Sequence, residues 1–302
     1  MAMAERLQLS PERYRTVTLA ALLAICGIVV TGAGVRLTGS GLGCTNWPKC
    51  DDRVTPPLQF HAMVEFINRM ITGVVSVAVI VAVLGSLVRR PRRRDLLWWS
   101  LGLVGGVVAQ IVWGGVTVLS HLNPAVVSGH FLISMVLVWN AVVLHDRAGR
   151  PGDVAVATRD RLGRLAMVTA CWAAVAFVTG PLVTGTGPHA GDATDPRVTR
   201  FDFDLLTIAR VHSAFMWVLV ALITATAIVA HRSPTSERAR RAARLLLVVV
   251  VAQGAVGYTQ FFTGVPPWLV AIHVAGATAV WALTVRLALV SGDAATPMAG
   301  AR

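Results

Sequence analysis

The chain has 302 residues, of which 55% are hydrophobic and only 14% are charged, and its formal net charge is +12. The mean hydropathy is +0.66. A soluble domain of this size carries roughly 25% charged residues. The composition therefore excludes an ordinary soluble enzyme and predicts an all-α protein that crosses the membrane several times.

Eight long apolar runs follow one another along the chain. Their approximate bounds are 16–36, 62–88, 97–119, 125–145, 163–183, 206–231, 241–262 and 268–290. A helix needs roughly 20 apolar residues to cross a bilayer, so each run predicts a transmembrane helix. The first run lacks a small-residue cleavage site, which favours a retained helix over a signal peptide.

Basic residues gather in every second connecting segment. Twenty of the 27 Lys and Arg residues lie in segments 1–15, 89–94, 146–164, 232–244 and 286–302, and the long loops 37–61 and 184–205 lie on the opposite side. The positive-inside rule then places both termini in the cytoplasm of a bacterial plasma membrane. The charge is explained by topology and anionic lipid, so we expect no nucleic-acid partner.

The chain also contains an internal repeat. The stretch "VVAQIVWGGVTVLSHLNPAVVSGH" (107–130) aligns without a gap to "VVAQGAVGYTQFFTGVPPWLVAIH" (250–273), and "VTG" recurs at 30–32 and 178–180. Four crossings restore the starting side, so the repeat predicts two tandem four-helix bundles with the same orientation. We expect a cytoplasmic N-terminus (1–15), a first bundle (16–146), a linker (147–162), a second bundle (163–290) and a cytoplasmic tail (291–302).

Three histidines lie several residues inside apolar helices near the predicted outer face. His212 and His273 fall in the second bundle, and His130 aligns with His273 at an offset of 143. A lone intramembrane histidine is as often a packing residue or proton relay as a ligand. A pair on facing helices, however, is the usual way to hold a heme by both axial positions.

The first bundle departs from this pattern at one position. At an offset of 144, Asn68 stands where the second bundle has His212. A neutral amide is a poor iron ligand, so the two sites are predicted to be unequal, with a weak or open position facing His130. Glu65 lies one helical turn outward of Asn68 on the same face, and His61 lies two turns outward. Arg69 is a candidate partner of a heme propionate, although a snorkelling surface arginine explains it equally well.

The first outer loop carries two cysteines in "GLGCTNWPKC", Cys44 and Cys50. The outer side of a bacterial membrane is oxidising, which favours a disulfide between them. A structural staple and a redox-active pair both fit this spacing. Cys26 and Cys171 lie within helices and are predicted to be small apolar core residues.

Together these motifs resemble the heme A synthase family of cytochrome oxidase biogenesis. The resemblance rests on "VTGAGVRLTGSGLGCTNWPKC", "VEFINR", "HLNPAVVSGHFLIS", "VTGTGPHAGD", "IARVHSAF" and "AIHVAGAT", in that order between about 15 and 290. It implies oxidation of a methyl group of heme O to the formyl group of heme A by successive hydroxylations. It also implies a heme b cofactor in the second bundle and the substrate heme in the first.

The resemblance assigns roles to particular residues. It implies that His212 and His273 ligate the iron of heme b, that His130 ligates the substrate heme, and that Glu65 is the carboxylate needed for activity. Cys44 and Cys50 match the family's outer-loop pair. Many members have histidine where Asn68 stands, and some carry a second cysteine pair that "GPHAGDATDPRVTRFDFD" lacks.

Other classes of protein fit part of this pattern. A b-type electron-transfer cytochrome would keep both hemes unmodified and would transfer electrons without Glu65. A transporter or heme-delivery protein is the other alternative, but the sequence has few buried charges and no pair of Gly/Pro-broken helices at mid-membrane, which argues against transport. The candidate partners are heme O, the lipid bilayer, heme O synthase, cytochrome oxidase assembly factors and further copies of this chain. Identifying the hemes extracted from the protein discriminates these classes.

Overall fold

The computed structural model describes residues 8–50, 52, 55–150, 160–192 and 194–292. Within them it has eight helices, each long and apolar enough to cross a membrane. They are α2 (Pro11–Leu37), α3 (Phe60–Val88), α4 (Arg94–Leu119), α5 (Pro124–Ala148), α6 (Arg161–Thr186), α7 (Leu205–Arg232), α8 (Glu237–Phe262) and α9 (Pro267–Val290). All eight predicted spans are confirmed as helices, with ends that differ by a few residues.

The helix ends follow local sequence signals. Proline stands in the first turn of α2, α5 and α9, where its missing N–H costs nothing. The side chain of Asp204 accepts a hydrogen bond from the Thr207 backbone N–H at the start of α7, and Ser236 does the same for Ala239 at the start of α8. These caps satisfy backbone donors that the helix itself leaves free.

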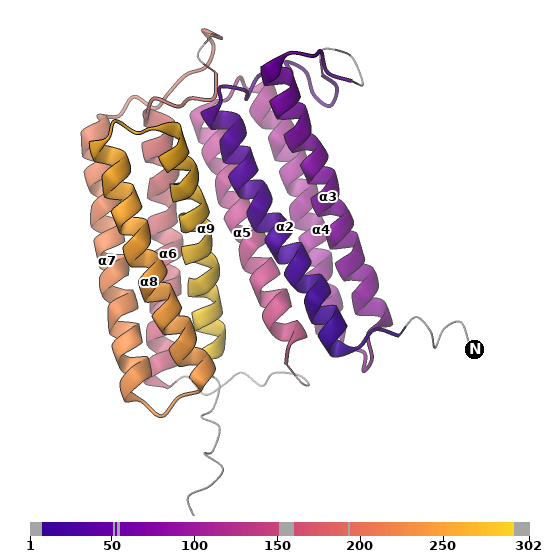
Figure 1. Ribbon diagram of the computed structural model, residues 1–302, viewed down its shortest axis with the longest axis vertical. Coiled ribbons are helices and arrows are strands. Elements are labelled where there is room, and N and C mark those ends of the chain that lie inside the picture. Colours follow the sequence, from indigo (N-terminus) through magenta and orange to yellow (C-terminus); the bar gives the residue numbers. More distant parts are fainter. Residues whose placement is uncertain (1–7, 51, 53–54, 151–159, 193, 293–302) are drawn as a thin grey trace, which may run out of the picture.

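The helices form two groups of four, α2 to α5 and α6 to α9, which lie beside each other with α5 and α9 in the middle (Figure 1). Among the described residues, α3 has no contact with α5 and α7 has none with α9. Each of these pairs is therefore diagonal within its group. Side chains that point inward from such a pair face each other across the group's interior.

The two groups are joined along their length. Helix α9 contacts α2 and α5, and α5 also contacts α6. The Trp281 indole N–H on α9 donates to the Met135 carbonyl of α5 at 2.7 Å, and both residues are buried. At the end that carries the long loops, the Arg36 guanidinium of α2 donates to the carbonyls of Thr184 (2.9 Å) and His189 (2.7 Å). The groups are thus fastened to each other at mid-length and at that end.

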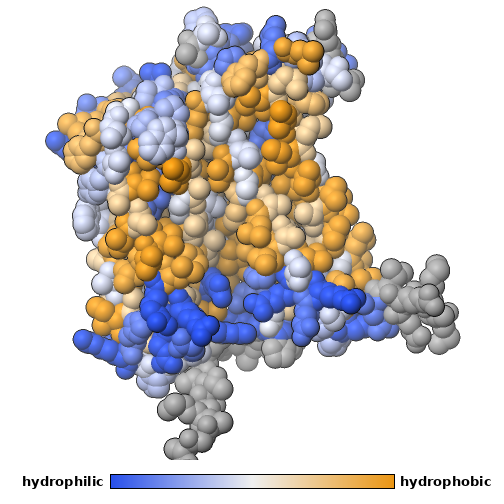
Figure 2. Space-filling model, viewed as in Figure 1, coloured by the Kyte–Doolittle hydropathy of each residue, from blue (hydrophilic) through white to orange (hydrophobic). Residues whose placement is uncertain are grey.

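The surface divides into bands along the helix axes. On the face that Figure 2 shows, apolar side chains form a belt across the middle and a strongly hydrophilic band lies at one end. Large apolar side chains of the helices are exposed, among them Val74 of α3, Trp98 of α4 and Val248 of α8. Helix α2 begins and α9 ends at the hydrophilic end, which we call the basic end because the short arginine-rich connections lie there; the opposite end is the loop end (Figure 1). Exposed apolar surface of this extent is what a lipid bilayer covers.

Three predicted segments fall partly outside the described residues. These are the N-terminus (1–15), the linker (147–162) and the tail (291–302), of which 1–7, 151–159 and 293–302 are not described. The remaining segment boundaries at 16, 146, 163 and 290 stay predictions.

Candidate functional site

The three intramembrane histidines lie at similar depths. His130 and His273 each lie six residues into their helices, roughly 9 Å from the loop end at 1.5 Å per residue. His212 lies seven residues into α7. His212 contacts Thr179 of α6 and His273 lies against Gly257 of α8, so both rings point from the diagonal helices α7 and α9 toward the interior of the second group.

The hydrogen bonds of His212 fix which ring nitrogen is available. The Thr179 hydroxyl donates to the Ala176 carbonyl at 2.6 Å, so its oxygen accepts the Nδ1 proton of His212 at 2.7 Å. An imidazole that donates from Nδ1 carries its lone pair on Nε2. Metal-ligating histidines are oriented in this way by a second partner. The Thr179 contact therefore fits His212 as a metal ligand.

His130 and His273 share a second kind of setting. The Nδ1 atoms of both rings are buried and have no hydrogen-bond partner among the described residues. Their backbone carbonyls accept from the side-chain amides of Gln110 (3.3 Å) and Gln253 (2.7 Å), respectively. A buried polar ring without partners costs free energy unless another group uses it.

A glycine lies beside each of these two rings. A Cβ atom on Gly114 would come within 3.5 Å of His130 Cε1, and one on Gly257 within 3.0 Å of His273 Cε1. The His273 ring therefore lies closer to the α8 backbone than a side chain at position 257 would readily allow, whereas a Cβ at position 114 would make only ordinary contact with His130. Apolar walls, small residues and unpaired imidazoles together fit a flat, iron-bearing macrocycle. Among the described residues there is no cluster of three or more His, Cys, Asp or Glu side chains for a simple metal ion.

Asn68 occupies the corresponding place on α3. Its Oδ1 accepts from the Thr31 hydroxyl of α2 at 2.8 Å. Thr31 and Thr179 are the central residues of the repeated "VTG" motif. The contact between Thr31 and Asn68 therefore matches the contact between Thr179 and His212. The sequence showed that the motif is repeated, but it did not show that each threonine contacts the polar residue on the neighbouring helix.

Glu65 is a buried carboxylate, 6% exposed, in the second turn of α3. One of its oxygens accepts the Cys44 backbone N–H at 2.7 Å, and the other pairs with Arg69 four residues along. A buried carboxylate persists when it is paired and hydrogen-bonded, as here. The contact joins Glu65 to the loop that holds the cysteines.

Arg69 ties the same loop to α3. Besides Glu65, its guanidinium donates to the carbonyls of Asn46 (3.4 Å), Pro48 (3.3 Å) and Lys49 (3.1 Å). The structure thus places Arg69 among loop carbonyls. Its predicted propionate contact remains a prediction, and in this arrangement a propionate would compete with these acceptors.

The disulfide between Cys44 and Cys50 is present, with both residues buried. The loop lies against α3 so closely that a Cβ on Gly43 would meet the His61 carbonyl oxygen at 2.2 Å. On its other side, Trp47 packs over Gly115 of α4, where a Cβ would lie 2.6 Å from the indole ring. Only glycine permits these two approaches.

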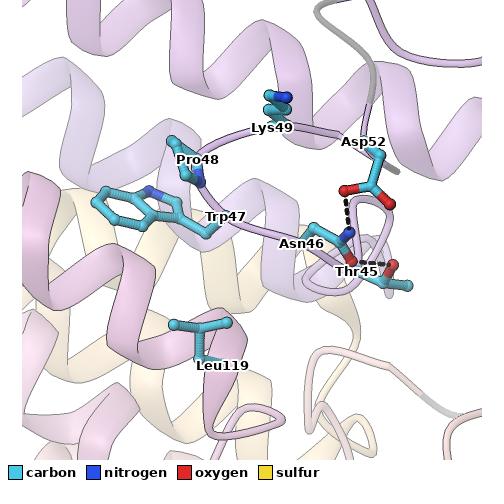
Figure 3. Close-up of a pocket in the computed structure, with 7 residues that line it drawn as sticks. All are labelled: Thr45, Asn46, Trp47, Pro48, Lys49, Asp52 and Leu119. Atoms are coloured by element: carbon cyan, nitrogen blue, oxygen red, sulfur yellow. Dashed lines mark hydrogen bonds between the residues drawn. The ribbon is translucent and has the colours of Figure 1, made fainter.

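Beneath this loop is a hollow of about 410 Å³ (Figure 3). It is lined by Thr45, Asn46, Trp47, Pro48, Lys49, Asp52 and Leu119. Figure 3 shows that Leu119, at the end of α4, is its only contribution from a helix, and that Asn46 bonds to both Thr45 and Asp52. The hollow includes none of the histidines, so it is separate from the predicted heme positions.

Two remaining polar residues near the loop end have structural partners. His61 Nδ1 lies 2.9 Å from the Ser40 hydroxyl. His121 lies 3.8 Å from Asp195, whose pKa is lowered to about 2 by its hydrogen bond to Arg197. Neither histidine is brought to the intramembrane site.

The eight helices and their intramembrane imidazoles define a multi-pass membrane protein with polar sites inside each helix group. Comparison with known families identifies it further. The family model described as "Cytochrome oxidase assembly protein" (COX15-CtaA) matches residues 15–63 and 58–285. The chain therefore belongs to this family, which confirms the family expected from the sequence motifs.

Individual relatives agree with this assignment. A heme A synthase of Methylobacterium sp. (strain 4-46) is 26% identical over 305 residues, covering 82% of this chain and 84% of that protein. Heme A synthases of Geobacillus kaustophilus and Listeria welshimeri are 34% and 31% identical over 110 and 177 residues. These two matches cover 35% and 54% of this chain and span only 34% and 56% of those proteins' own length.

Proposed function

We propose that this protein is a heme A synthase that oxidises a methyl group of heme O to a formyl group. The observation that carries the proposal is the unequal pair of sites. The second group presents two imidazoles on diagonal helices, and the first presents one imidazole, an amide and a buried carboxylate. Family membership and the similarity to heme A synthases over most of the chain support it.

In this proposal His212 and His273 hold heme b in the second group, and the resulting iron centre supplies electron transfer. The Thr179 contact keeps the His212 lone pair on Nε2, and Gly257 lets the His273 ring lie close against α8. Two neutral imidazoles in an apolar site favour a stable low-spin heme that exchanges electrons and stays bound. The residues present therefore fit a resident cofactor.

In the first group His130 holds the substrate, heme O. Converting a methyl to a formyl group removes four electrons from one carbon through successive hydroxylations and loss of water. Glu65 is the carboxylate that accepts a proton or stabilises positive charge on the reacting substrate. Its pairing with Arg69 and its hydrogen bond from the Cys44 N–H hold that carboxylate in one place beside the site.

The same proposal includes topology and ancestry. We infer that the loop end faces outward and the basic end faces the cytoplasm, which agrees with the arginine-rich connections. We also infer that the two groups arose by tandem duplication. Matched contacts support this: Thr31 to Asn68 against Thr179 to His212, and Gln110 to His130 against Gln253 to His273.

The test is to produce the protein in a membrane that makes heme O, extract the hemes and identify them by mass and absorption. We expect heme A, or its hydroxylated precursor, beside heme b. Heme b alone, with heme O and reductant supplied, would contradict the synthase and favour an electron-transfer cytochrome.

The role of Glu65 is tested in the same assay. Glu65→Gln removes the charge while preserving size, and we expect heme b to remain bound while heme A formation falls at least 100-fold. Glu237→Gln, a substitution of an exposed carboxylate at the basic end, is the matched control and leaves heme A formation unchanged. A normal heme A yield in the Glu65 variant would refute the assignment.

A further inference from the structure

Asn68 and His212 each contact an equivalent threonine, but the hydrogen bonds have opposite directions. Thr179 accepts from His212, whereas Thr31 donates to Asn68. Thr179 gives its hydroxyl proton to Ala176 and accepts from His212. Thr31 lies 2.8 Å from Asn68 Oδ1 and 3.3 Å from the Ile28 carbonyl, so the shorter contact takes its proton. The amide oxygen of Asn68 is therefore occupied as a hydrogen-bond acceptor on the side of α2.

This contact determines what Asn68 can offer to the interior of the first group. A carboxamide is planar, so anchoring Oδ1 at Thr31 turns the NH₂ group away from Thr31. No hydrogen bond from this nitrogen occurs within the described part of the chain. An amide nitrogen donates two protons and has no lone pair for a metal. It is also attached directly to Cγ, whereas the imidazole Nε2 lies one atom further out.

We propose that Asn68 is a hydrogen-bond donor to a small diatomic or anionic ligand bound opposite His130, and that this position is open in the first group and closed in the second. The inference rests on the proposed function, since it requires a heme at His130. In this proposal Asn68 does not ligate the iron itself. Its amide is shorter than an imidazole, so it leaves room for a ligand and supplies the N–H that binds that ligand.

The neighbourhood of Asn68 suits such a ligand. Glu65 lies one turn outward on the same face of α3, and its charge is compensated by Arg69. The opposite diagonal helix, α5, contributes His130, whose ring lies against Gly114 of α4. In the second group the residue aligned with Glu65 is Ala209, and the position facing His273 is filled by His212. Within the part of the chain that the structure describes, the first group combines a buried carboxylate with an amide in place of the imidazole, and the second group does not.

The experiment measures binding of cyanide to the ferric protein and of carbon monoxide to the ferrous protein, in membranes where both hemes are loaded. We expect one of the two hemes to bind each ligand. Asn68→Leu keeps the side-chain volume and removes the donor, and we expect cyanide to dissociate roughly tenfold faster, as a lost hydrogen bond to a charged ligand implies. Asn68→His supplies an imidazole, and we expect a second low-spin spectrum and loss of carbon monoxide binding.

Ser76→Ala is the matched control. Its hydroxyl lies two turns further along α3 and bonds only to the Thr72 carbonyl, so cyanide release stays unchanged. Unaltered ligand binding in both Asn68 variants overturns the inference, and so does a wild-type protein that binds neither ligand. If either of these two results is found while heme A is still formed normally, the role of Asn68 is refuted but the proposed synthase function stands. Asn68-dependent cyanide binding without heme A formation upholds the inference and overturns the proposed synthase.

Discussion

The two helix groups share one scaffold and differ in what is placed on it. Both have a threonine that orients a polar residue on the second helix and a glutamine that binds the carbonyl of a histidine on the fourth. In the second group the aligned positions hold Ala209, His212 and Ser213; in the first they hold Glu65, Asn68 and Arg69. The comparison teaches that the same set of orienting contacts can present different functional groups when three residues on one helix face are exchanged.

The loops differ in the same sense. The loop of the first group contains the disulfide and is bound to Glu65 and Arg69 through backbone groups. In the second group, the loop packs Phe201 against Gly185 of α6 and contains no cysteine. The carboxylate of Glu65 is thus bound to its loop in the first group, whereas the aligned residue of the second group, Ala209, has no carboxylate to bind.

The largest expected effect is the loss of heme b from the second group when one of its two histidine ligands is removed. His212→Ala or His273→Ala removes an axial ligand, and we expect the low-spin heme b spectrum to disappear, because one imidazole cannot replace two. Absorption and heme content per protein measure this. His231→Ala, at the basic end of α7, is the matched control. A full low-spin spectrum in either ligand variant would show that the second group does not hold heme b in this way.

A weaker effect is expected at the orienting threonine. Thr179→Val keeps the shape of the side chain but removes the acceptor of the His212 Nδ1 proton. Loss of such a partner typically weakens metal binding 10–100-fold, so we expect heme b to be lost correspondingly faster to a heme-scavenging protein. Thr31→Val, its counterpart in the first group, should leave heme b retention unchanged. If Thr31→Val accelerated heme b loss as much as Thr179→Val, the proposal that only the second group holds heme b would be refuted.

The third prediction concerns the loop. Gly43→Ala places a methyl group where the His61 carbonyl now lies, so the loop must move away from α3. Overpacking of this kind costs about 1–3 kcal/mol of stability. We expect a lower melting temperature and faster reduction of the disulfide by an external thiol. Gly27→Ala, where a Cβ meets nothing within 4 Å, controls for the glycine change alone. An unchanged reduction rate would mean that this contact does not hold the loop.

Sequence predicted the parts of this molecule that depend on repeating patterns. The eight helices follow from the apolar runs. The disulfide follows from two nearby cysteines in a loop that is predicted to face the oxidising side of the membrane. The contacts of Arg36 with Thr184 and His189, and of Glu65 with the Cys44 N–H, were not predictable. These contacts use backbone groups of irregular loops, whose positions no periodic pattern encodes.

The smallest expected effect distinguishes the charge of Arg69 from its shape. Arg69→Lys keeps a cation near Glu65 but loses the fork that reaches three loop carbonyls at once. If the fork matters by holding the loop over Glu65, heme A formation should fall by a few fold and thiol reduction of the disulfide should accelerate in parallel. If Arg69 instead binds a propionate, the variant should weaken binding of the substrate heme while the reduction rate stays unchanged. Measuring both quantities on one preparation therefore decides between loop anchoring and substrate binding at Arg69.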